Sequence, residues 1–258
     1  MTGKITALYR HPVKGFTPEG LASARLEAGA VFPFDRLYAV EDGPSGFDPE
    51  HPAWVSKQKF TVLAKIAAVA KVRTLYDEHD DILRATAPGA DDFRASFAEE
   101  TGRQAFADWL ADRLGEEASG PLRVVAGPGH RFTDHPLGHV SIINLASVRD
   151  LAEKIGKPVN PLRFRANLYV SGWPAWAENG WVDRTLALGE ARARVFKPIV
   201  RCAATQVDPD TALRDLDIPA ALHEHFGHVL CGIYVHVADG GRVCLGDACT
   251  TPQPARVA

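Results

Sequence analysis

The sequence has no long apolar run, and among its 258 residues there are only one methionine and four cysteines. No stretch of about 18 apolar residues occurs, which argues against a membrane-spanning helix. The first sixteen residues, MTGKITALYRHPVKGF, have no apolar segment of the kind that signal peptides carry. We therefore expect a cytoplasmic protein whose cysteines stay reduced, and not a disulfide framework. A single methionine is also too few for a methionine-rich adaptable binding surface.

Several sequence motifs of large enzyme classes are missing as well. The chain has no G-x-x-x-x-G-K-[ST], no G-x-G-x-x-G and no G-x-S-x-G, which argues against a P-loop enzyme, a Rossmann dehydrogenase and an α/β-hydrolase. The formal net charge of −3 gives no sign of non-specific nucleic-acid binding. We expect a small-molecule substrate, and neither nucleic acid nor a membrane as a partner.

The pattern of the sequence predicts a β-rich α+β protein. Short segments of apolar and β-branched residues recur at roughly 8–12-residue spacing between turn residues, which is typical of barrels or curved sheets. We expect strands at residues 4–9, 36–40, 69–76, 82–86, 122–125, 140–144, 166–170, 185–188, 191–195, 199–205, 233–237 and 242–245. A linker-like stretch at 115–120 divides the chain into domains 1–118 and 119–258.

Only three helices are expected. The clearest covers residues 101–115, where Thr101 and Gln104 match a capping box and Gly115 supplies the stop. A second helix ends at Gly156, and a third, with proline in its first turn, covers residues 219–226. Two hairpins are predicted, one joining 69–76 to 82–86, the other turning at residues 239–241.

Cys202, in KPIVRCAATQVDPDTALRD (197–215), is the most informative single residue. It could be a buried structural cysteine, a nucleophile or a metal ligand. Lys197 and Arg201 bring positive charge near it, which would favour the reactive thiolate. From spacing alone the buried structural cysteine is favoured, because free cysteine is among the most buried residue types.

Two further clusters of residues admit a functional and an ordinary interpretation. Residues 223–231, H-E-H-x-x-H-x-x-C, suggest zinc, but histidines two apart on a helix point to different faces, so a solvated helix end is favoured. The basic residues could converge on a phosphorylated ligand, although the sequence alone favours surface ion pairs. These basic residues are Lys14, Arg36, Arg163, Arg165 and Arg201.

Five segments in order resemble the MOSC-domain family, whose name derives from the C-terminal domain of molybdenum cofactor sulfurase. The resemblance is to members with an N-terminal MOSC-type β-barrel domain, such as the amidoxime-reducing component and its bacterial relatives. The segments are YRHPVKG (9–15), FDRLY (34–38), NPLRFRANLYVSG (160–172), RCAATQVDPDTALRD (201–215) and CGIYVHVADGGRVCLGD (231–247). The resemblance implies a MOSC β-barrel domain after that N-terminal domain, with a few helices.

The resemblance also implies a molybdenum cofactor, in which a pyranopterin holds the metal. Cys202 would be the metal ligand and the catalytic residue, because a thiolate is the soft donor that such a centre takes. The cofactor-binding residues implied by the motifs are Lys14, Gly15, Arg36, Arg165 and Arg201, with Asp134, His135 and Asn167 on looser matches. Gly15, Ala166 and Ala212 depart from the residues usual in the family.

The implied activity is reduction of N-hydroxylated or related N–O or S–O compounds. The alternatives are a carrier that delivers cofactor or sulfur to another enzyme, and a degenerate barrel that binds no metal. Few residues follow Gly246, so we expect no C-terminal 2Fe–2S domain and an external electron donor, ferredoxin-like or cytochrome b5-like. His135, His139 and Asp208 are candidate proton donors.

Overall fold

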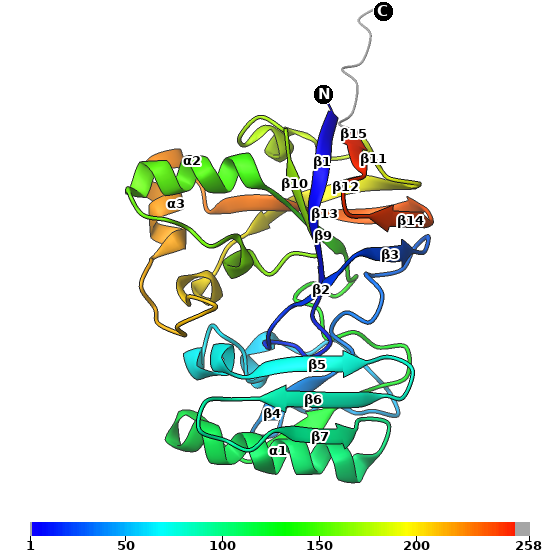
Figure 1. The fold of residues 1–258 in the computed structure, drawn as a ribbon, viewed down its shortest axis with the longest axis vertical. Helices are drawn as coiled ribbons and strands as arrows, with labels where there is room; N and C mark the ends of the chain where they lie inside the picture. The colour runs from blue at the N-terminus through cyan, green and yellow to red at the C-terminus, as the bar shows by residue number, and fades with distance from the viewer. Residues whose placement is uncertain (1, 251–258) are drawn as a thin grey trace, which may run out of the picture.

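A computed structural model describes residues 2–250 as two bodies, one above the other along the long axis (Figure 1). The upper body is a closed barrel in which seven strands follow one another in the order β10, β9, β13, β12, β11, β15 and β1, and β1 pairs again with β10. A short strand, β2 (Glu19–Leu21), pairs with the end of β1 and is not part of the closed barrel. The seven strands are β1 (Thr2–Arg10), β9 (Val140–Asn144), β10 (Leu168–Ser171), β11 (Thr185–Leu188), β12 (Ala191–Val200), β13 (Leu230–Asp239) and β15 (Ala248–Thr250).

Small and branched apolar residues fill the barrel interior, and along the strands they alternate with exposed residues. In β12, Ala191, Ala193 and Val195 are buried while the residues between them are exposed. Ile233 and Val235 fill the same interior from β13, each fully buried. Because successive strand residues point to opposite faces, this pattern fixes which side of each strand faces the core.

Two helices cover one side of the barrel, α2 (Leu145–Ile155) and α3 (Ile218–Phe226) (Figure 1). The Asn144 side chain caps α2 by accepting a hydrogen bond from the Ala146 N–H at 3.0 Å. Gly156 ends the helix in the left-handed conformation with φ 66°, which glycine adopts without a steric penalty. The predicted stop at Gly156 is therefore confirmed.

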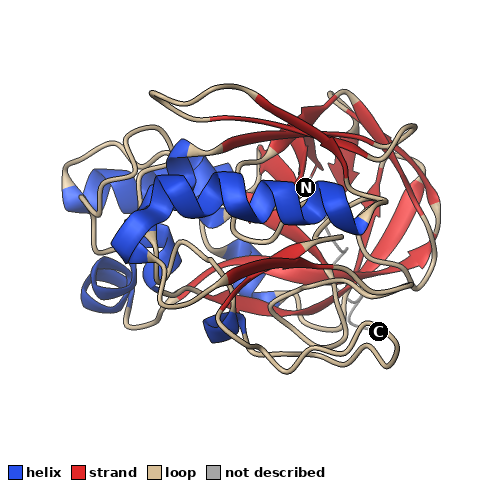
Figure 2. Ribbon diagram, turned by 90° about the horizontal axis from the view of Figure 1, so that it is seen from below, coloured by secondary structure: helices blue, strands red, loops and turns tan. Residues whose placement is uncertain are grey.

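The lower body contains a three-stranded sheet, a two-stranded ladder and one helix. The sheet has the order β5 (Arg73–Asp77), β6 (Ile82–Thr86) and β7 (Phe93–Ser96). The ladder joins β4 (Ala39–Asp42) to β8 (Leu122–Val125). The helix α1 (Glu100–Leu114) buries Phe106 and Leu110 against this body, and Figure 2 shows it from below, lying across the front.

These elements confirm the predicted β-rich α+β class with a closed β-barrel, and the described residues contain three α-helices. No helix within residues 2–250 is long and apolar enough to cross a membrane. The boundary predicted after residue 118 stays a prediction. In space, the N-terminal strand β1 belongs to the barrel, whereas β8, which follows residue 118, pairs with β4 in the lower body.

Several local predictions were wrong. Residues 67–71 form a 3-10 helix, η2 (Ala67–Lys71), so only the second half of the segment 69–76 is a strand. Residues 191–195 and the beginning of 199–205 belong to one strand, β12, and a 3-10 helix, η6 (Ala203–Gln206), follows it. The segment 36–40 is a strand only from Ala39 onward.

The predicted capping box and the second hairpin are also absent among the described residues. Helix α1 has Glu99 at its N-cap and no side-chain cap bond, while the Gln104 side chain donates to Asp108 instead. The turn at residues 239–241 exists, but β14 (Gly241–Cys244) pairs with β3 (Ser23–Leu26) and not with β13. Strand pairing over more than 200 residues leaves no local signal in the sequence.

Candidate functional site

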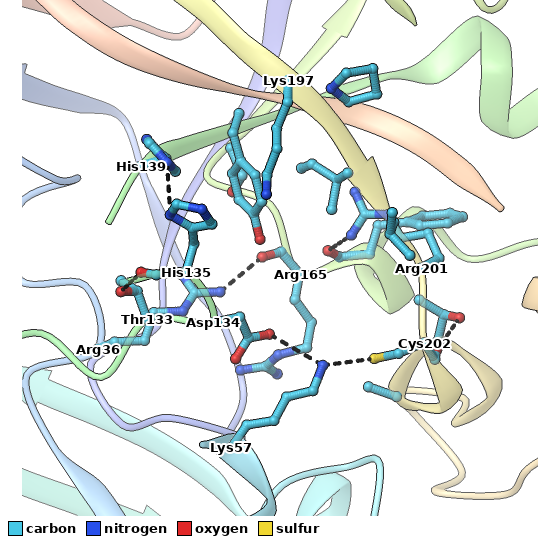
Figure 3. Close-up of a pocket in the computed structure, with 18 of the residues that line it drawn as sticks. Arg36, Lys57, Thr133, Asp134, His135, His139, Arg165, Lys197, Arg201 and Cys202 are labelled. Atoms are coloured by element: carbon cyan, nitrogen blue, oxygen red, sulfur yellow. Dashed lines mark hydrogen bonds and ion pairs between the residues drawn. The ribbon is translucent and has the colours of Figure 1, made fainter. Parts of the chain in front are cut away.

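A cavity of about 350 Å³ lies where the barrel meets the lower body (Figure 3). The lower body contributes residues 35–36 and 57, and the barrel side contributes the end of β12, Tyr234 of β13, the loop that precedes β9, and residues 163–165, 201–202 and 204–205. A smaller cavity of about 50 Å³ adjoins it. The two share Arg36, Lys57, Asp134 and Arg165, so they form one continuous site with a narrow end.

Cys202 lines the larger cavity at the point where β12 ends and η6 begins. Its thiol is half-buried, and the Lys57 Nζ donates a hydrogen bond to Sγ at 3.3 Å. Burial alone would lower the pKa of Lys57, but Asp134 and Cys202 raise it above the ordinary value. A charged ammonium group therefore lies beside the sulfur.

The other three cysteines lie outside both cavities, and all four are free thiols. Cys231 and Cys249 are buried inside the protein, and burial raises the pKa of the Cys231 thiol to about 12. Cys244 is half-buried in β14. The location of Cys202 at the cavity favours a reactive thiol over the buried structural cysteine that spacing alone favoured.

Arg36 and Arg165 approach each other from the two bodies. Both adopt the left-handed backbone conformation that non-glycine residues rarely take, with φ 51° and 52°. The Arg36 guanidinium donates to the Asp35 carboxylate and to the Arg165 carbonyl oxygen, the latter at 3.1 Å. Burial would raise the pKa of Asp35, but Arg36 and the buried His11 keep it below its ordinary value.

The Arg165 guanidinium lines both cavities and makes no hydrogen bond or ion pair with residues 2–250. One of its terminal guanidinium nitrogens is buried without a hydrogen-bond acceptor. Burial, followed by the repulsion of Arg36, lowers the pKa of Arg165 to about 10. A buried cation without a partner is costly, so this position is suited to binding an anion.

Arg163, only two residues earlier, shows the opposite arrangement. Its side chain is 1% exposed and ion-paired to Asp208 at 2.9 Å and to Asp215 at 2.6 Å. Another of its nitrogens donates to the Gln206 carbonyl oxygen at 2.9 Å. Although it touches the cavity wall, Arg163 uses both terminal nitrogens to hold the Cys202 loop against η4 (Pro161–Phe164), and only its buried Nε has no acceptor among the described residues. Asp208, a candidate proton donor, is thus an ion-pair partner outside the lining of both cavities.

Lys14 and Gly15 line the narrow end of the site. The Lys14 ammonium group, 4% exposed, donates to Asp134 and, at 2.9 Å, to the Phe132 carbonyl oxygen. Gly15 has φ 91°, and a Cβ there would lie 2.3 Å from the Thr61 carbonyl oxygen. The residue must therefore be glycine in this backbone, which explains why serine, usual in the family, is absent.

Arg201 and Asn167 are bound to the protein itself. The Arg201 Nε donates to the Cys231 carbonyl oxygen at 2.8 Å and another nitrogen donates to the Phe164 carbonyl oxygen at 2.9 Å. Asn167 is fully buried behind the lining, where its side chain accepts from Ser141 and donates to the Tyr9 carbonyl oxygen. Arg201 still lines the cavity, whereas Asn167 does not.

One wall of the larger cavity is aromatic and basic. The His135 Nδ1 and the His139 Nε2 are 3.2 Å apart, and Phe196 stacks on the His139 ring with centroids 4.4 Å apart. Burial, together with His236, lowers the pKa of His139 to about 3. Both candidate proton donors on this wall are therefore neutral imidazoles near neutral pH.

The structure thus brings most of the predicted site residues together. Those that line one or both cavities are Lys14, Gly15, Arg36, Asp134, His135, Arg165, Arg201 and Cys202. Sequence reasoning missed Lys57 and Tyr234, and it considered Lys197 only as a nearby charge. Lys57 starts η1 (Lys57–Lys59) in a stretch of otherwise irregular backbone, so no local pattern marks it. Within residues 2–250, no three His, Cys, Asp or Glu side chains gather closely enough to hold a metal ion by themselves.

Two family models match the chain. The model described as "MOSC N-terminal beta barrel domain" matches residues 2–117, and the one described as "MOSC domain" matches residues 129–250. Similar curated proteins include mitochondrial amidoxime-reducing component 1 of Mus musculus, 31% identical over 30% of this chain and 22% of that protein. Mitochondrial amidoxime reducing component 2 of Bos taurus is 30% identical over 42% of this chain and 35% of that protein.

The chain thus matches about a fifth to a third of the length of these relatives. Among solved structures, the YUAD protein from Bacillus subtilis is similar over 96% of this chain and 94% of its own, with 14% identity and a TM-score of 0.46.

Proposed function

The chain belongs to the MOSC-domain family, with the MOSC N-terminal β-barrel domain preceding the MOSC domain, and on this premise we propose that it binds a molybdenum cofactor in the cavity and uses it to reduce N–O bonds. The proposed substrates are N-hydroxylated compounds or related N–O or S–O compounds, and an external protein donates the electrons. The names of its curated relatives, which describe amidoxime reduction, support this reaction class.

One observation carries the proposal. Cys202 presents its sulfur to a cavity in which the buried Arg165 guanidinium has no partner among the described residues. A thiolate is a soft metal ligand, and an unpartnered buried arginine fits a phosphate or another anionic group. A phosphate-bearing pterin with a soft metal would satisfy both groups at once, so the residues present fit this cofactor.

The remaining residues have three functions. Arg165, Arg36 and Lys14 would hold the anionic part of the cofactor at the narrow end, which Gly15 also lines. Lys57, 3.3 Å from the Cys202 sulfur, would stabilise the thiolate form. Arg163, fixed by two carboxylates, holds the loop that carries Cys202.

A bound molybdenum cofactor would supply the two-electron redox chemistry. Breaking the N–O bond consumes two electrons and two protons and releases water. His135 is our candidate for delivering a proton, because its ring lines the cavity and lies within hydrogen-bond distance of His139. As a neutral imidazole it would act as a relay, accepting a proton at one ring nitrogen while it passes on the N–H proton of the other.

Two further proposals come from the sequence and not from the site. We propose the cytoplasm as the compartment, although the curated relatives are named as mitochondrial. We also propose a ferredoxin-like or cytochrome b5-like protein as the electron donor.

Turnover of an amidoxime with a chemical electron donor tests the proposed reaction. We expect protein purified from a host that makes the cofactor to convert benzamidoxime to benzamidine with reduced methyl viologen. The Cys202→Ser variant should be inactive, while Cys244→Ser, which changes a half-buried cysteine outside the cavity, should keep full activity. Equal activity of the wild type and Cys202→Ser would contradict the proposal.

The carrier hypothesis predicts a different result from the same preparation. A carrier would give no turnover, and it would restore the activity of a cofactor-free molybdenum enzyme in proportion to the amount added. That outcome would keep the cavity as a cofactor site but remove the reductase activity.

A further inference from the structure

The basic side chains that line the larger cavity differ in whether the protein itself neutralises them. There are six, against two carboxylates, Asp35 and Asp134. The six are Arg36, Lys57, Arg163, Arg165, Lys197 and Arg201. Asp35 pairs with Arg36, Asp134 pairs with Lys14 and lies 3.9 Å from Lys57, and Arg163 is held by carboxylates outside the cavity.

Arg201 donates to backbone carbonyl oxygens, whereas Lys197 is left without any partner among the described residues. Its ammonium group makes no hydrogen bond or ion pair within residues 2–250, and its nearest aromatic contact is Phe196, with the ring centroid 5.4 Å from Nζ. Arg165 is the other cation without a partner, but it lies at the narrow end that the two cavities share. Lys197 lines only the larger cavity, so the two unpaired cations serve different parts of the site.

An irregularity in β12 turns Lys197 toward the cavity. Val195 pairs with Val235, and both side chains fill the barrel interior. The next pair is Lys197 with Tyr234, so Phe196 is an extra residue that forms a bulge. Without the bulge, Lys197 would share the inward face of Val195; with it, Lys197 lies on the same face as Tyr234, which lines the cavity.

Two histidine rings define the wall around Lys197. His135 and His139 lie close enough for Lys197 to lower the pKa of both rings, although burial contributes more. Near neutral pH these rings are uncharged, so Lys197 carries the positive charge of this wall. In Figure 3 it extends into the cavity from β12, while Lys57 enters from the other side.

We propose that Lys197 selects the substrate: it binds a carboxylate on the N-hydroxylated compound and so holds the N–O group toward Cys202. This inference rests on the proposed function and narrows its substrate class to anionic compounds. The His135 and Tyr234 side chains offer the polar wall against which such a substrate lies, and Phe196 packs behind the His135 ring.

Matched pairs of charged and neutral ligands test the proposal. We would measure kcat/KM for 4-carboxybenzamidoxime and for benzamidoxime with reduced methyl viologen, in protein purified with its cofactor. We would also measure the affinity for 4-carboxybenzamide and for benzamide, which cannot be reduced, by calorimetry. The binding measurement reports the contribution of Lys197 to ligand affinity without any turnover. It therefore separates a failure of this inference from a failure of the reductase activity.

The wild type should favour each carboxylate-bearing compound about tenfold, because a hydrogen bond to a charged group is worth roughly that factor. Lys197→Met should abolish this preference, mainly through KM. Lys197→Arg should restore part of it. Arg192→Met, an exposed cation on the same strand outside the cavity, should keep the full preference.

Three results would overturn the proposal. The first is a wild type that binds charged and neutral ligands equally well. The second is a Lys197→Met variant that keeps the wild-type preference. The third is a loss of molybdenum from Lys197→Met at unchanged thermal stability, which would assign Lys197 to the cofactor. Absence of turnover with both amidoximes, while the binding preference depends on Lys197, would contradict only the reductase activity.

Discussion

The barrel interior and the cavity beneath it share strands β12 and β13 but differ in how their side chains are satisfied. Inside the barrel, Val195, Ile233 and Val235 are fully buried in one cluster of apolar residues. On the cavity side, Lys197 and Arg165 have no acceptor among residues 2–250, and Arg36 and Arg165 hold strained backbone conformations. Strain and unpartnered charge cluster at functional sites, because the surrounding fold has to hold them in place.

The largest effect on stability should come from a substitution in the barrel interior. Ile233→Ala removes a fully buried side chain from the interior and leaves a cavity. We expect the free energy of unfolding to fall by ~2–5 kcal/mol, measured by urea denaturation of cofactor-free protein. A loss below about 1 kcal/mol would mean that the barrel interior is far looser than its burial indicates.

The two neighbouring arginines sharpen the comparison. Arg163→Ala should lower the free energy of unfolding by about 2–3 kcal/mol, because Asp208, Asp215 and a carbonyl oxygen lose their donor. Arg165→Ala should change it by no more than about 1 kcal/mol in cofactor-free protein, since no partner is lost, yet it should weaken cofactor retention. Equal losses of thermal stability would give Arg165 a structural role.

Acid should act on the cavity wall through His139. Its pKa of about 3 in the folded protein lies below the usual value, because burial, His236, His135 and Lys197 disfavour the charged ring. Between pH 6.5 and about 3 the unfolded chain therefore binds a proton that the folded protein does not, so stability falls as the pH falls.

The slope should be at most about 1.4 kcal/mol per pH unit for this group. His139→Asn should reduce the fall in stability between pH 6.5 and 4.5, which thermal denaturation at several pH values would measure. His79→Asn, in an exposed turn, is the matched control and should leave the slope unchanged. An identical slope in the wild type and His139→Asn would show that His139 titrates alike in both states.

The smallest effect concerns the start of α1. Thr101→Ala should change the free energy of unfolding by less than about 0.5 kcal/mol, because Glu99 occupies the N-cap and no side-chain cap bond forms. A loss of about 1 kcal/mol or more in urea denaturation would restore the capping box that the sequence predicts.

The sequence predicted those features that depend on local pattern. Short runs of apolar and β-branched residues located β1, β9 and β11, and the apolar face with its glycine stop located α2, because these patterns follow directly from backbone geometry. Pairings between distant strands, such as β14 with β3, could not be predicted, since nothing near either strand specifies its partner.

The candidate site divides in the same way. Cys202, Arg36 and Arg165 could be named because motifs mark them, and the structure brings them to one cavity. Lys57 reaches the Cys202 sulfur only because the lower body docks on the barrel, and Lys197 faces the cavity only because a bulge shifts the alternation of β12. The docking of the two bodies and the position of a bulge depend on tertiary contacts, so the hydrophobic periodicity of the sequence does not predict them.

The most direct measurement is molybdenum per chain, determined by elemental analysis of protein purified gently from a host that makes the cofactor. We predict near-stoichiometric molybdenum in the wild type and in Cys244→Ser, and its loss in Cys202→Ser. Molybdenum absent from the wild type even after reconstitution, or equal in the wild type and Cys202→Ser, would contradict the assignment of Cys202 as the metal ligand.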